Sequence, residues 1–320
     1  MYVNQSTPAE FIILGFPGSL SMQFFCFLLL LIIYLLTLMS NFVIIITTWI
    51  ERRLHTPMYF YLRNLSFLEI CYVSVTVPKI LTTITSHGRY ISFPGCIMQL
   101  FFFFFLGSTE CFLFGVIAYD RYLAICQPLR YTTLMSYTMC CSLSICSVIG
   151  GFITTFPHIV LISQLPFCGS NIINHFFCDS PPLLQLSCAD TYLIDMMDFL
   201  CASLVILLSF LVTLISYIYI FVKVLKIPTN SRRKTFSTCC AHLIVVFIYY
   251  STVIFMYVRP KVSFAFTLNR VVAVFYTVIT PLLNPIIYCL RNKEVKTSIK
   301  KRLGFLMNCY IAKLSIEGNV

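Results

Sequence analysis

One long apolar segment closes with the run Ile117-Ala118-Tyr119-Asp120-Arg121-Tyr122-Leu123-Ala124-Ile125-Cys126-Gln127-Pro128-Leu129-Arg130-Tyr131. A charged Asp–Arg pair at the end of a hydrophobic helix is costly in a membrane, so its presence indicates a functional site. The simpler interpretation is an interfacial anchor, in which Arg121 extends its guanidinium group out of the bilayer. The rest of the chain decides between these two interpretations.

The composition places this segment in a membrane protein. Hydrophobic residues make up 59% of the 320 residues and charged residues only 10%, too few to cover the surface of a water-soluble protein of this length. The net charge of +11 would suit nucleic-acid binding, but 17 of the 22 Lys and Arg residues fall on one side of the predicted spans. This asymmetry is the positive-inside pattern, so the basic side is predicted to be cytoplasmic.

Seven apolar segments predict seven membrane-spanning helices, because most reach the roughly 20 residues that cross a bilayer core. They cover residues 24–48, 57–83, 97–120, 138–162, 197–222, 235–258 and 270–290. The fold class predicted is therefore an all-α membrane protein, a seven-helix bundle that spans residues 24–290. Residues 1–23 become an extracellular N-terminus with a glycosylation sequon at Asn4, and residues 291–320 a cytoplasmic tail with a short amphipathic helix.

Two carboxylates fall within the predicted spans. Glu110 shares a helix face with Phe103, Gly107 and Arg121, since these positions recur at three- and four-residue steps. An ionised carboxylate at this depth needs a partner, a cation or a proton, and Glu69 lies at a comparable depth in the second segment. Two facing carboxylates either hold a cation, for which sodium is the candidate, or share one proton, and the sequence leaves both open.

Four cysteines fall on the predicted extracellular side, Cys96, Cys168, Cys178 and Cys188. An even set of cysteines in an oxidising compartment predicts disulfide bonds, whose connectivity the sequence alone does not fix. Three of the four lie in the long loop at about residues 163–196. A connection of this length is usually functional or disordered, and its cysteines, prolines and apolar residues favour a fixed lid.

Further motifs follow in order along the chain. They are Leu54-His55-Thr56-Pro57-Met58-Tyr59-Phe60-Tyr61-Leu62, His175-Phe176-Phe177-Cys178-Asp179, Ser216-Tyr217, Lys234-Thr235-Phe236-Ser237-Thr238-Cys239-Cys240-Ala241-His242-Leu243 and Pro281-Leu282-Leu283-Asn284-Pro285-Ile286-Ile287-Tyr288. With the run that ends at Tyr131, they resemble the signatures of olfactory receptors, a branch of the rhodopsin-like G-protein-coupled receptors, over roughly residues 10–303. Two departures are Ser40, where the family usually has Gly, and Glu69, where it usually has Asp.

The resemblance implies a function. It implies a receptor of the plasma membrane that binds small hydrophobic volatile molecules and activates a stimulatory G protein of the olfactory type, raising cyclic AMP. It implies no enzymatic activity and no cofactor, and the sodium ion at Glu69 and Glu110 stays the alternative to a shared proton that the two carboxylates raise. Two alternatives are a receptor of the same fold that senses a non-volatile metabolite outside the nose, and a membrane transporter. A transporter tends to show internal repeats and helices broken at mid-membrane, and the sequence shows neither.

The resemblance also assigns roles to particular residues. It implies a ligand pocket lined by Phe103, Phe104, Gly107, Ser108, Cys201, Val205, Val253, Ile254, Tyr257 and Thr277. It implies a G-protein switch made of Asp120, Arg121, Tyr217, Lys234, His242, Asn284, Pro285 and Tyr288. In the resting form Asp120 would hold Arg121, and on activation the inner end of the sixth helix would swing outward. For the disulfides it favours Cys96–Cys178 and Cys168–Cys188, with Cys96–Cys188 as an alternative.

Overall fold

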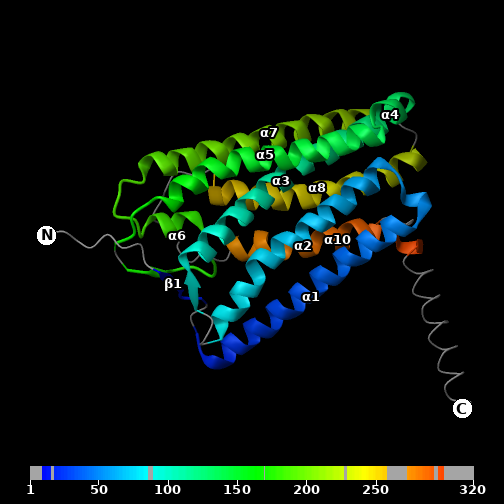
Figure 1. Ribbon diagram of the computed structural model, residues 1–320. Helices are drawn as coiled ribbons and strands as arrows, with labels where there is room; N and C mark the ends of the chain where they lie inside the picture. The colour runs from blue at the N-terminus through cyan, green and yellow to red at the C-terminus, as the bar shows by residue number, and fades with distance from the viewer. Residues whose placement is uncertain are drawn as a thin grey trace, which may run out of the picture.

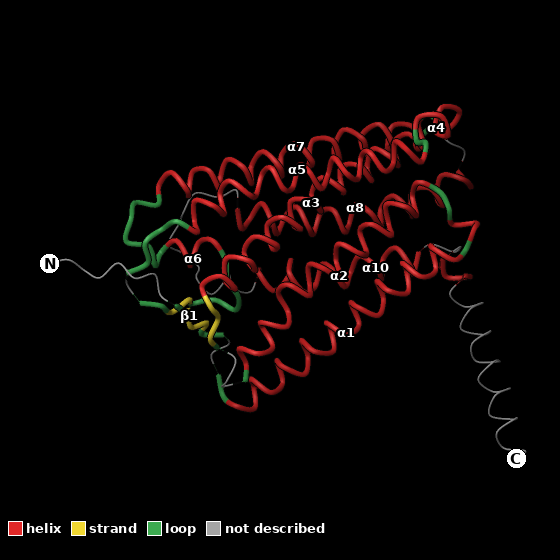
Figure 2. The backbone as a smooth tube through the Cα atoms, in the orientation of Figure 1, coloured by secondary structure: helices red, strands yellow, loops and turns green. Residues whose placement is uncertain are grey.

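A bundle of long helices runs along one axis in the computed structural model, with a small sheet at one end and the short helix α4 at the other (Figure 1). The structure describes residues 9–15, 18–85, 89–168, 170–226, 229–257, 272–291 and 295–298, and for 229–242, 275 and 288–291 it describes the backbone only. Figure 2 shows that loops gather at the two ends of the bundle and that helix fills the middle. Below, the two ends are called the sheet end and the α4 end.

The bundle helices have the following bounds. They are α1 (Leu20–Ile50), α2 (Pro57–Ile84), α3 (Phe93–Cys126), α5 (Tyr137–Ser163), α7 (Tyr192–Leu225), α8 (Thr229–Tyr257), the π-helix η2 (Phe275–Ile279) and α10 (Thr280–Arg291). Shorter pieces are η1 (Arg52–Leu54), α4 (Pro128–Leu134) and α6 (Ser180–Leu184). In the described part of the chain, five helices are long and apolar enough to cross a membrane, and Leu243–Tyr257 and Val272–Ile287 are shorter apolar stretches.

Several helices begin before the predicted segments, and the reason is capping. The Ser19 hydroxyl accepts the N–H of Met22 at 3.4 Å, and α1 therefore begins at Leu20. Residues 20–23, which were predicted to belong to the N-terminal segment, are thus part of the helix. Ser92 accepts the N–H of Gly95 at 3.2 Å and starts α3 in the same way. Serine side chains cap orphan backbone donors at helix starts, so the helix extends beyond the apolar run that predicted it.

Helix α3 is the centre of the bundle and packs against α2, α5 and α7. Its contact with α5 is close because Gly151 lacks a side chain: a Cβ there would lie 2.3 Å from Thr109 Oγ1 and 3.0 Å from the Phe105 carbonyl oxygen. A small residue lets two membrane helices approach closely.

A three-stranded sheet covers one end of the bundle. Its middle strand β1 (Glu10–Ile13) pairs with β2 (Tyr90–Ser92) antiparallel and with β3 (Ile172–Ile173) parallel. The side chains of Phe11 and Ile13 in β1 are fully buried. The sheet therefore joins the N-terminal segment to the loop before α3 and to the long loop before α7, an arrangement that helix periodicity did not predict.

Candidate functional site

A small cavity lies inside the bundle between α3, α7, α8 and η2, with a volume of about 60 Å³. Its lining consists of Tyr72, Phe103, Phe104, Gly107, Ser108, Cys111, Ala202, Val205, Ile206, Tyr249, Val253, Tyr257 and Tyr276. Six of these residues are aromatic, so large rings form much of the wall and the cavity is narrow.

Tyrosine hydroxyls supply most of the polar atoms of the cavity wall. The hydroxyl oxygens of Tyr257 and Tyr276 lie 2.9 Å apart, and the Tyr249 hydroxyl donates to the carbonyl of Gly107 at 3.0 Å. Around them the surfaces are aromatic, as in the stacking of Tyr72 on Phe103 with ring centroids 5.5 Å apart. An apolar wall with a few hydrogen-bonding groups is typical of sites for small, mainly hydrophobic ligands.

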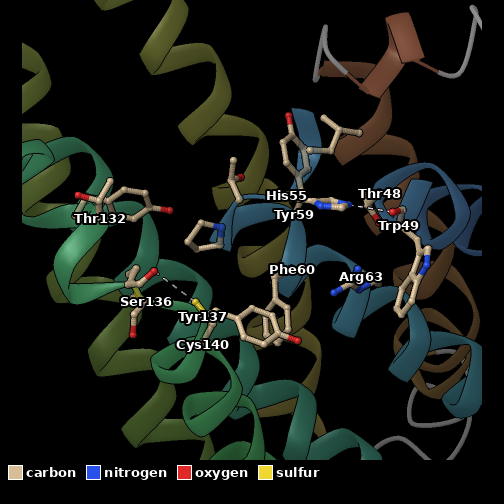
Figure 3. A pocket seen from close by; sticks show the side chains of 15 residues that line it. Thr48, Trp49, His55, Tyr59, Phe60, Arg63, Thr132, Ser136, Tyr137 and Cys140 are labelled. Atoms are coloured by element: carbon tan, nitrogen blue, oxygen red, sulfur yellow. Dashed lines mark hydrogen bonds between the residues drawn. The ribbon is translucent and has the colours of Figure 1, made fainter. Parts of the chain in front are cut away.

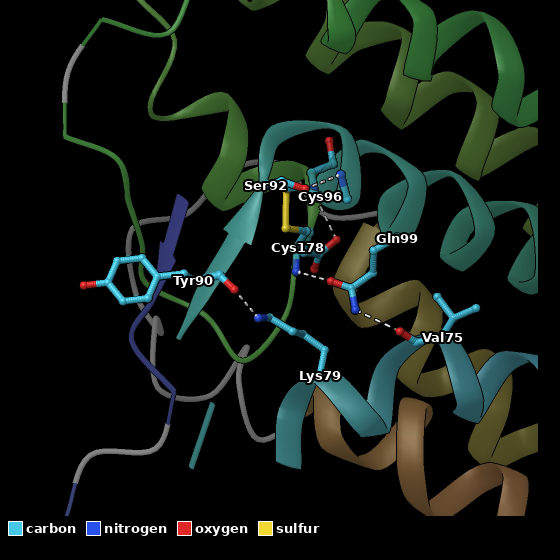
Figure 4. Close-up of a disulfide and its surroundings, with 10 residues drawn as sticks. Val75, Lys79, Tyr90, Ser92, Cys96, Gln99 and Cys178 are labelled. Carbon is cyan, nitrogen blue, oxygen red and sulfur yellow. Dashed lines mark hydrogen bonds between the residues drawn. A yellow bond between two sulfur atoms is a disulfide. The ribbon is translucent and has the colours of Figure 1, made fainter. Parts of the chain in front are cut away.

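Two disulfide bonds hold the long loop in place. Cys96–Cys178 ties the loop to the start of α3, and Cys168–Cys188 closes the loop on itself. This is the pairing that the resemblance favoured. Gln99, one turn along α3 from Cys96, accepts the N–H of Cys178 at 3.0 Å and so fixes the loop a second time (Figure 4).

The same loop reaches the cavity wall. The ring of Phe177 lies 5.0 Å, centroid to centroid, from that of Phe103, which lines the cavity. Beside it Asp179 is buried, and its Oδ1 accepts the N–H of Ser180 at 2.9 Å. Burial raises the pKa of Asp179 to about 7, and the nearby charge of Asp198 adds to that effect.

A cluster of buried polar side chains lies inside the bundle. It consists of Asn41 of α1, Glu69 of α2, Glu110 of α3 and Asn284 of α10. Asn284 donates to Glu69 Oε1, and Glu110 interacts electrostatically with Glu69. Four buried oxygens have no hydrogen-bond donor among the described residues: Asn41 Oδ1, Glu69 Oε2, Glu110 Oε1 and Asn284 Oδ1. Buried polar atoms are normally satisfied, and a set made only of oxygens suits a hard cation or added protons.

Proline shapes the helix that carries Asn284. Pro285 lacks an N–H, so the carbonyl of Pro281, four residues earlier, loses its helical donor. Asn41 Nδ2 lies 3.5 Å from that carbonyl oxygen and also donates to Thr37 at 3.0 Å. The amide of α1 thus partly replaces the missing helical bond.

A second polar cluster lies near the α4 end. Arg121 Nε donates to Asp120 Oδ2 at 3.0 Å, and the Tyr131 hydroxyl donates to Asp120 Oδ1 at 2.8 Å. Arg121 Nη1 also lies 2.8 Å from the sulfur of Met58, and Tyr217 interacts with Arg121 electrostatically. The Asp120 side chain is 1% exposed and that of Arg121 19%, so this is an inward-facing ion pair. An arginine that served only as an interfacial anchor would extend into water.

Seven of the ten predicted ligand residues line the cavity, and Cys201, Ile254 and Thr277 do not. Thr277 instead donates its hydroxyl to the carbonyl of Ala273 at 2.6 Å. The prediction missed six lining residues: Tyr72, Cys111, Ala202, Ile206, Tyr249 and Tyr276. Ala202 follows Cys201 and Tyr276 precedes Thr277, so at these two places the predicted residue is the sequence neighbour of one that lines the cavity. At Thr277 the π-helix η2 contributes to this difference, because a π-turn adds a residue and rotates the helix face.

Some predicted residues lie outside what the structure describes. Asn4 is outside the described ranges, and so is most of the predicted amphipathic tail beyond residues 295–298. For Lys234, His242 and Tyr288 the backbone is described and the side chain is not. These assignments stay predictions.

Comparison with known proteins agrees with this architecture. The family model described as "Olfactory receptor" matches residues 30–305. Human olfactory receptor 6B1 is 50% identical over 298 residues, which are 93% of this chain and 96% of that protein. Human olfactory receptor 6N1 is 48% identical over 95% of this chain and 98% of that receptor. Mouse olfactory receptor 6B9 is 46% identical over 94% of this chain and 96% of that receptor.

The resemblance found in the motifs is thus confirmed over nearly the whole chain. The predicted seven-helix fold is confirmed with it, since the family has this bundle and the described helices form its greater part. Members of the family are multi-pass plasma-membrane receptors, not enzymes, that bind odorants and couple to G proteins. The chain belongs to the olfactory receptor family of rhodopsin-like G-protein-coupled receptors, and it is an odorant receptor.

Proposed function

We propose that this receptor detects small, mainly apolar odorants that carry one hydrogen-bonding group, and that they bind in the cavity between α3, α7, α8 and η2. The observation that carries the proposal is the chemistry of that wall, which is aromatic and aliphatic except for Ser108, Cys111 and the tyrosine hydroxyls. One donor or acceptor on the ligand can pair with the Tyr257–Tyr276 hydroxyls. The remaining ligand surface is buried against hydrocarbon, which is favourable in proportion to its area.

The coupling proposed is to a stimulatory G protein of the olfactory type, which raises cyclic AMP. The sheet end then faces the outside and the α4 end the cytoplasm, in agreement with the basic residues near the α4 end and the disulfide bonds at the sheet end. The closed Asp120–Arg121 pair suits a resting state. An odorant shifts the receptor from this state only if it binds the open form more tightly than the closed one.

A cation is proposed for the buried polar cluster. Glu69, Glu110, Asn41 and Asn284 would hold a sodium ion, which would neutralise the two carboxylates inside the bundle. The support is the set of buried oxygens that lack a donor. A single shared proton is the competing arrangement.

The test of the signalling proposal is cyclic AMP in cells that express the receptor with the olfactory-type G protein, across a broad odorant panel. Arg121→Ala, with surface expression verified, is the comparison. We expect a concentration-dependent rise for a few volatile compounds in the wild type and none in Arg121→Ala. Equal responses in both proteins, or silence of a wild type that reaches the surface, would contradict the proposal.

A further inference from the structure

A second and larger cavity, of about 660 Å³, opens at the α4 end between the end of α1, the start of α2, α4 and the start of α5 (Figure 3). It shares only Tyr131 with the Asp120–Arg121 cluster and no residue with the odorant cavity. The described residues that line it include no Asp or Glu, whereas Arg63 and several hydroxyl-bearing residues belong to the lining. The cavity is therefore suited to an anionic group.

Arg63 is the Lys or Arg side chain among the described residues that line this cavity. Its guanidinium carbon lies 4.9 Å from the ring centroid of Trp49 and 5.6 Å from that of Phe60, and Figure 3 shows it between these two side chains. Within the described ranges no carboxylate lies within 4.0 Å of it. Aromatic faces hold a guanidinium group without using its N–H donors, so those donors remain available to a ligand.

A separate apolar groove of about 410 Å³ lies farther along α2 and α5, with α3 also contributing to its wall, and it shares no lining residue with the first cavity. It begins one residue beyond Arg63 at Asn64, whose amide donates to Ser144 of α5 at 3.0 Å, and extends along α2 to Cys71. Apart from a few small polar side chains its wall is hydrocarbon, and Phe67 on its rim is 63% exposed. From Arg63 to Cys71 the helix rises about 12 Å. A ligand with an anionic head and a long apolar chain matches this sequence of surfaces.

We propose that the α2–α5 seam binds an anionic phospholipid, with its phosphate on Arg63 and an acyl chain in the apolar groove. The cytoplasmic leaflet is the source, because it carries the anionic lipids and the α4 end faces it in the orientation proposed above. Trp49 and Tyr137 flank the cavity and are 67% and 73% exposed. Exposed aromatic residues of this kind mark the headgroup level of a membrane.

The chain contains a single tryptophan, Trp49, so tryptophan fluorescence reports on the lipid that contacts the rim of this cavity. The full-length receptor is reconstituted in phosphatidylcholine vesicles that contain equal fractions of either brominated phosphatidylserine or brominated phosphatidylcholine, since bromine quenches tryptophan on contact. We expect phosphatidylserine to quench Trp49 with a relative binding constant about five times higher, the effect of one basic side chain near the surface. Arg63→Gln removes this preference, and Lys226→Gln, an exposed cation at the same end of α7, keeps it.

Equal quenching by the two lipids in the wild type overturns the proposal, as does a preference that survives in Arg63→Gln, because general surface charge then explains it. Cys71→Phe is a second variant that narrows the apolar groove without changing a charge. It is expected to lower the preference, and an unchanged preference would contradict the placement of the acyl chain. Since both lipids are present in both leaflets, the result does not depend on how the receptor is oriented or on which odorant it binds.

Discussion

At the scale of single residues, the receptor buries a few polar and charged side chains in an otherwise apolar bundle. Asp179 lies in the long loop, Glu69 and Glu110 in the middle of the bundle, and Asp120 with Arg121 near the α4 end. Each is costly to bury without a partner, and each partner can change with pH, ions or ligand. We therefore expect the stability of the receptor to depend on pH and on ions through these groups.

Protonation of Asp179 is expected to stabilise the folded receptor. Its pKa is about 7 in the folded protein and about 4 in an unfolded chain, so between these values the folded state binds a proton that the unfolded state does not. The free energy of unfolding should fall as pH rises from about 4 to about 7. Asp179→Asn remains neutral and still caps α6, so its melting temperature should depend less on pH across this window.

The control for that experiment is Asp190→Asn. Asp190 is exposed and, like Asp179, accepts a nearby backbone N–H, from Tyr192 at 2.9 Å. It should keep the pH dependence of the wild type. If Asp179→Asn and Asp190→Asn show the same pH profile, the buried carboxyl is not the group that titrates.

Sodium is expected to stabilise the receptor through the central carboxylates. At a sodium concentration ten times the dissociation constant the gain is about 1.4 kcal/mol, which raises the melting temperature by a few degrees relative to choline chloride of equal ionic strength. Glu110→Gln should abolish the difference, and Glu10→Gln, an exposed glutamate of β1, should not. Equal melting temperatures of the wild type in the two salts would rule out the cation and leave the shared proton.

At the scale of secondary structure elements, the close packing of α3 against α5 is one of the main helix contacts of the bundle. Gly151→Ala would place a methyl group 2.3 Å from Thr109 Oγ1 and 3.0 Å from a backbone oxygen of α3. Such overpacking costs about 1–3 kcal/mol, so surface expression and melting temperature should both fall. Gly115→Ala is the matched change on α3, where the added methyl group meets its nearest neighbours at an ordinary 3.7 Å. Loss of stability in both variants to the same extent would show that helix contact is not the cause.

The membrane spans could be predicted from the sequence, whereas the exact helix starts, the helical phase and the sheet could not. Length and apolarity predicted the spans, because a bilayer allows little else than a helix of about 20 residues. The helix starts at Leu20 and Phe93 depended on serine caps outside the apolar runs. Helical phase was less certain: one residue turns a face by about 100°, so Cys201 and Thr277 were chosen where Ala202 and Tyr276 line the cavity. The sheet around Phe11 could not be predicted, because its strands are short and pair segments distant in sequence.

At the scale of the whole molecule, the described helices connect a ligand cavity near the sheet end with an ion pair near the α4 end, and α3 contributes to both through Phe103 and Arg121. The cavity is narrow, about 60 Å³, and its wall is formed by side chains of several helices. Movement of packed helices is the means by which a ligand shifts a two-state receptor. We therefore expect odorants to activate the receptor from this cavity.

The most direct measurement compares two neighbouring substitutions on α7, using cyclic AMP as the readout and an odorant that activates the wild type. Val205→Phe fills the cavity, and Leu204→Phe adds the same ring on a side chain that is 63% exposed on the outside of the bundle. We expect Val205→Phe to raise the half-maximal odorant concentration by about tenfold or more, the effect of about 1.4 kcal/mol lost in a filled pocket, while Leu204→Phe changes it little. Equal dose–response curves for the two variants, both at the cell surface, would contradict the claim that this cavity is where odorants bind.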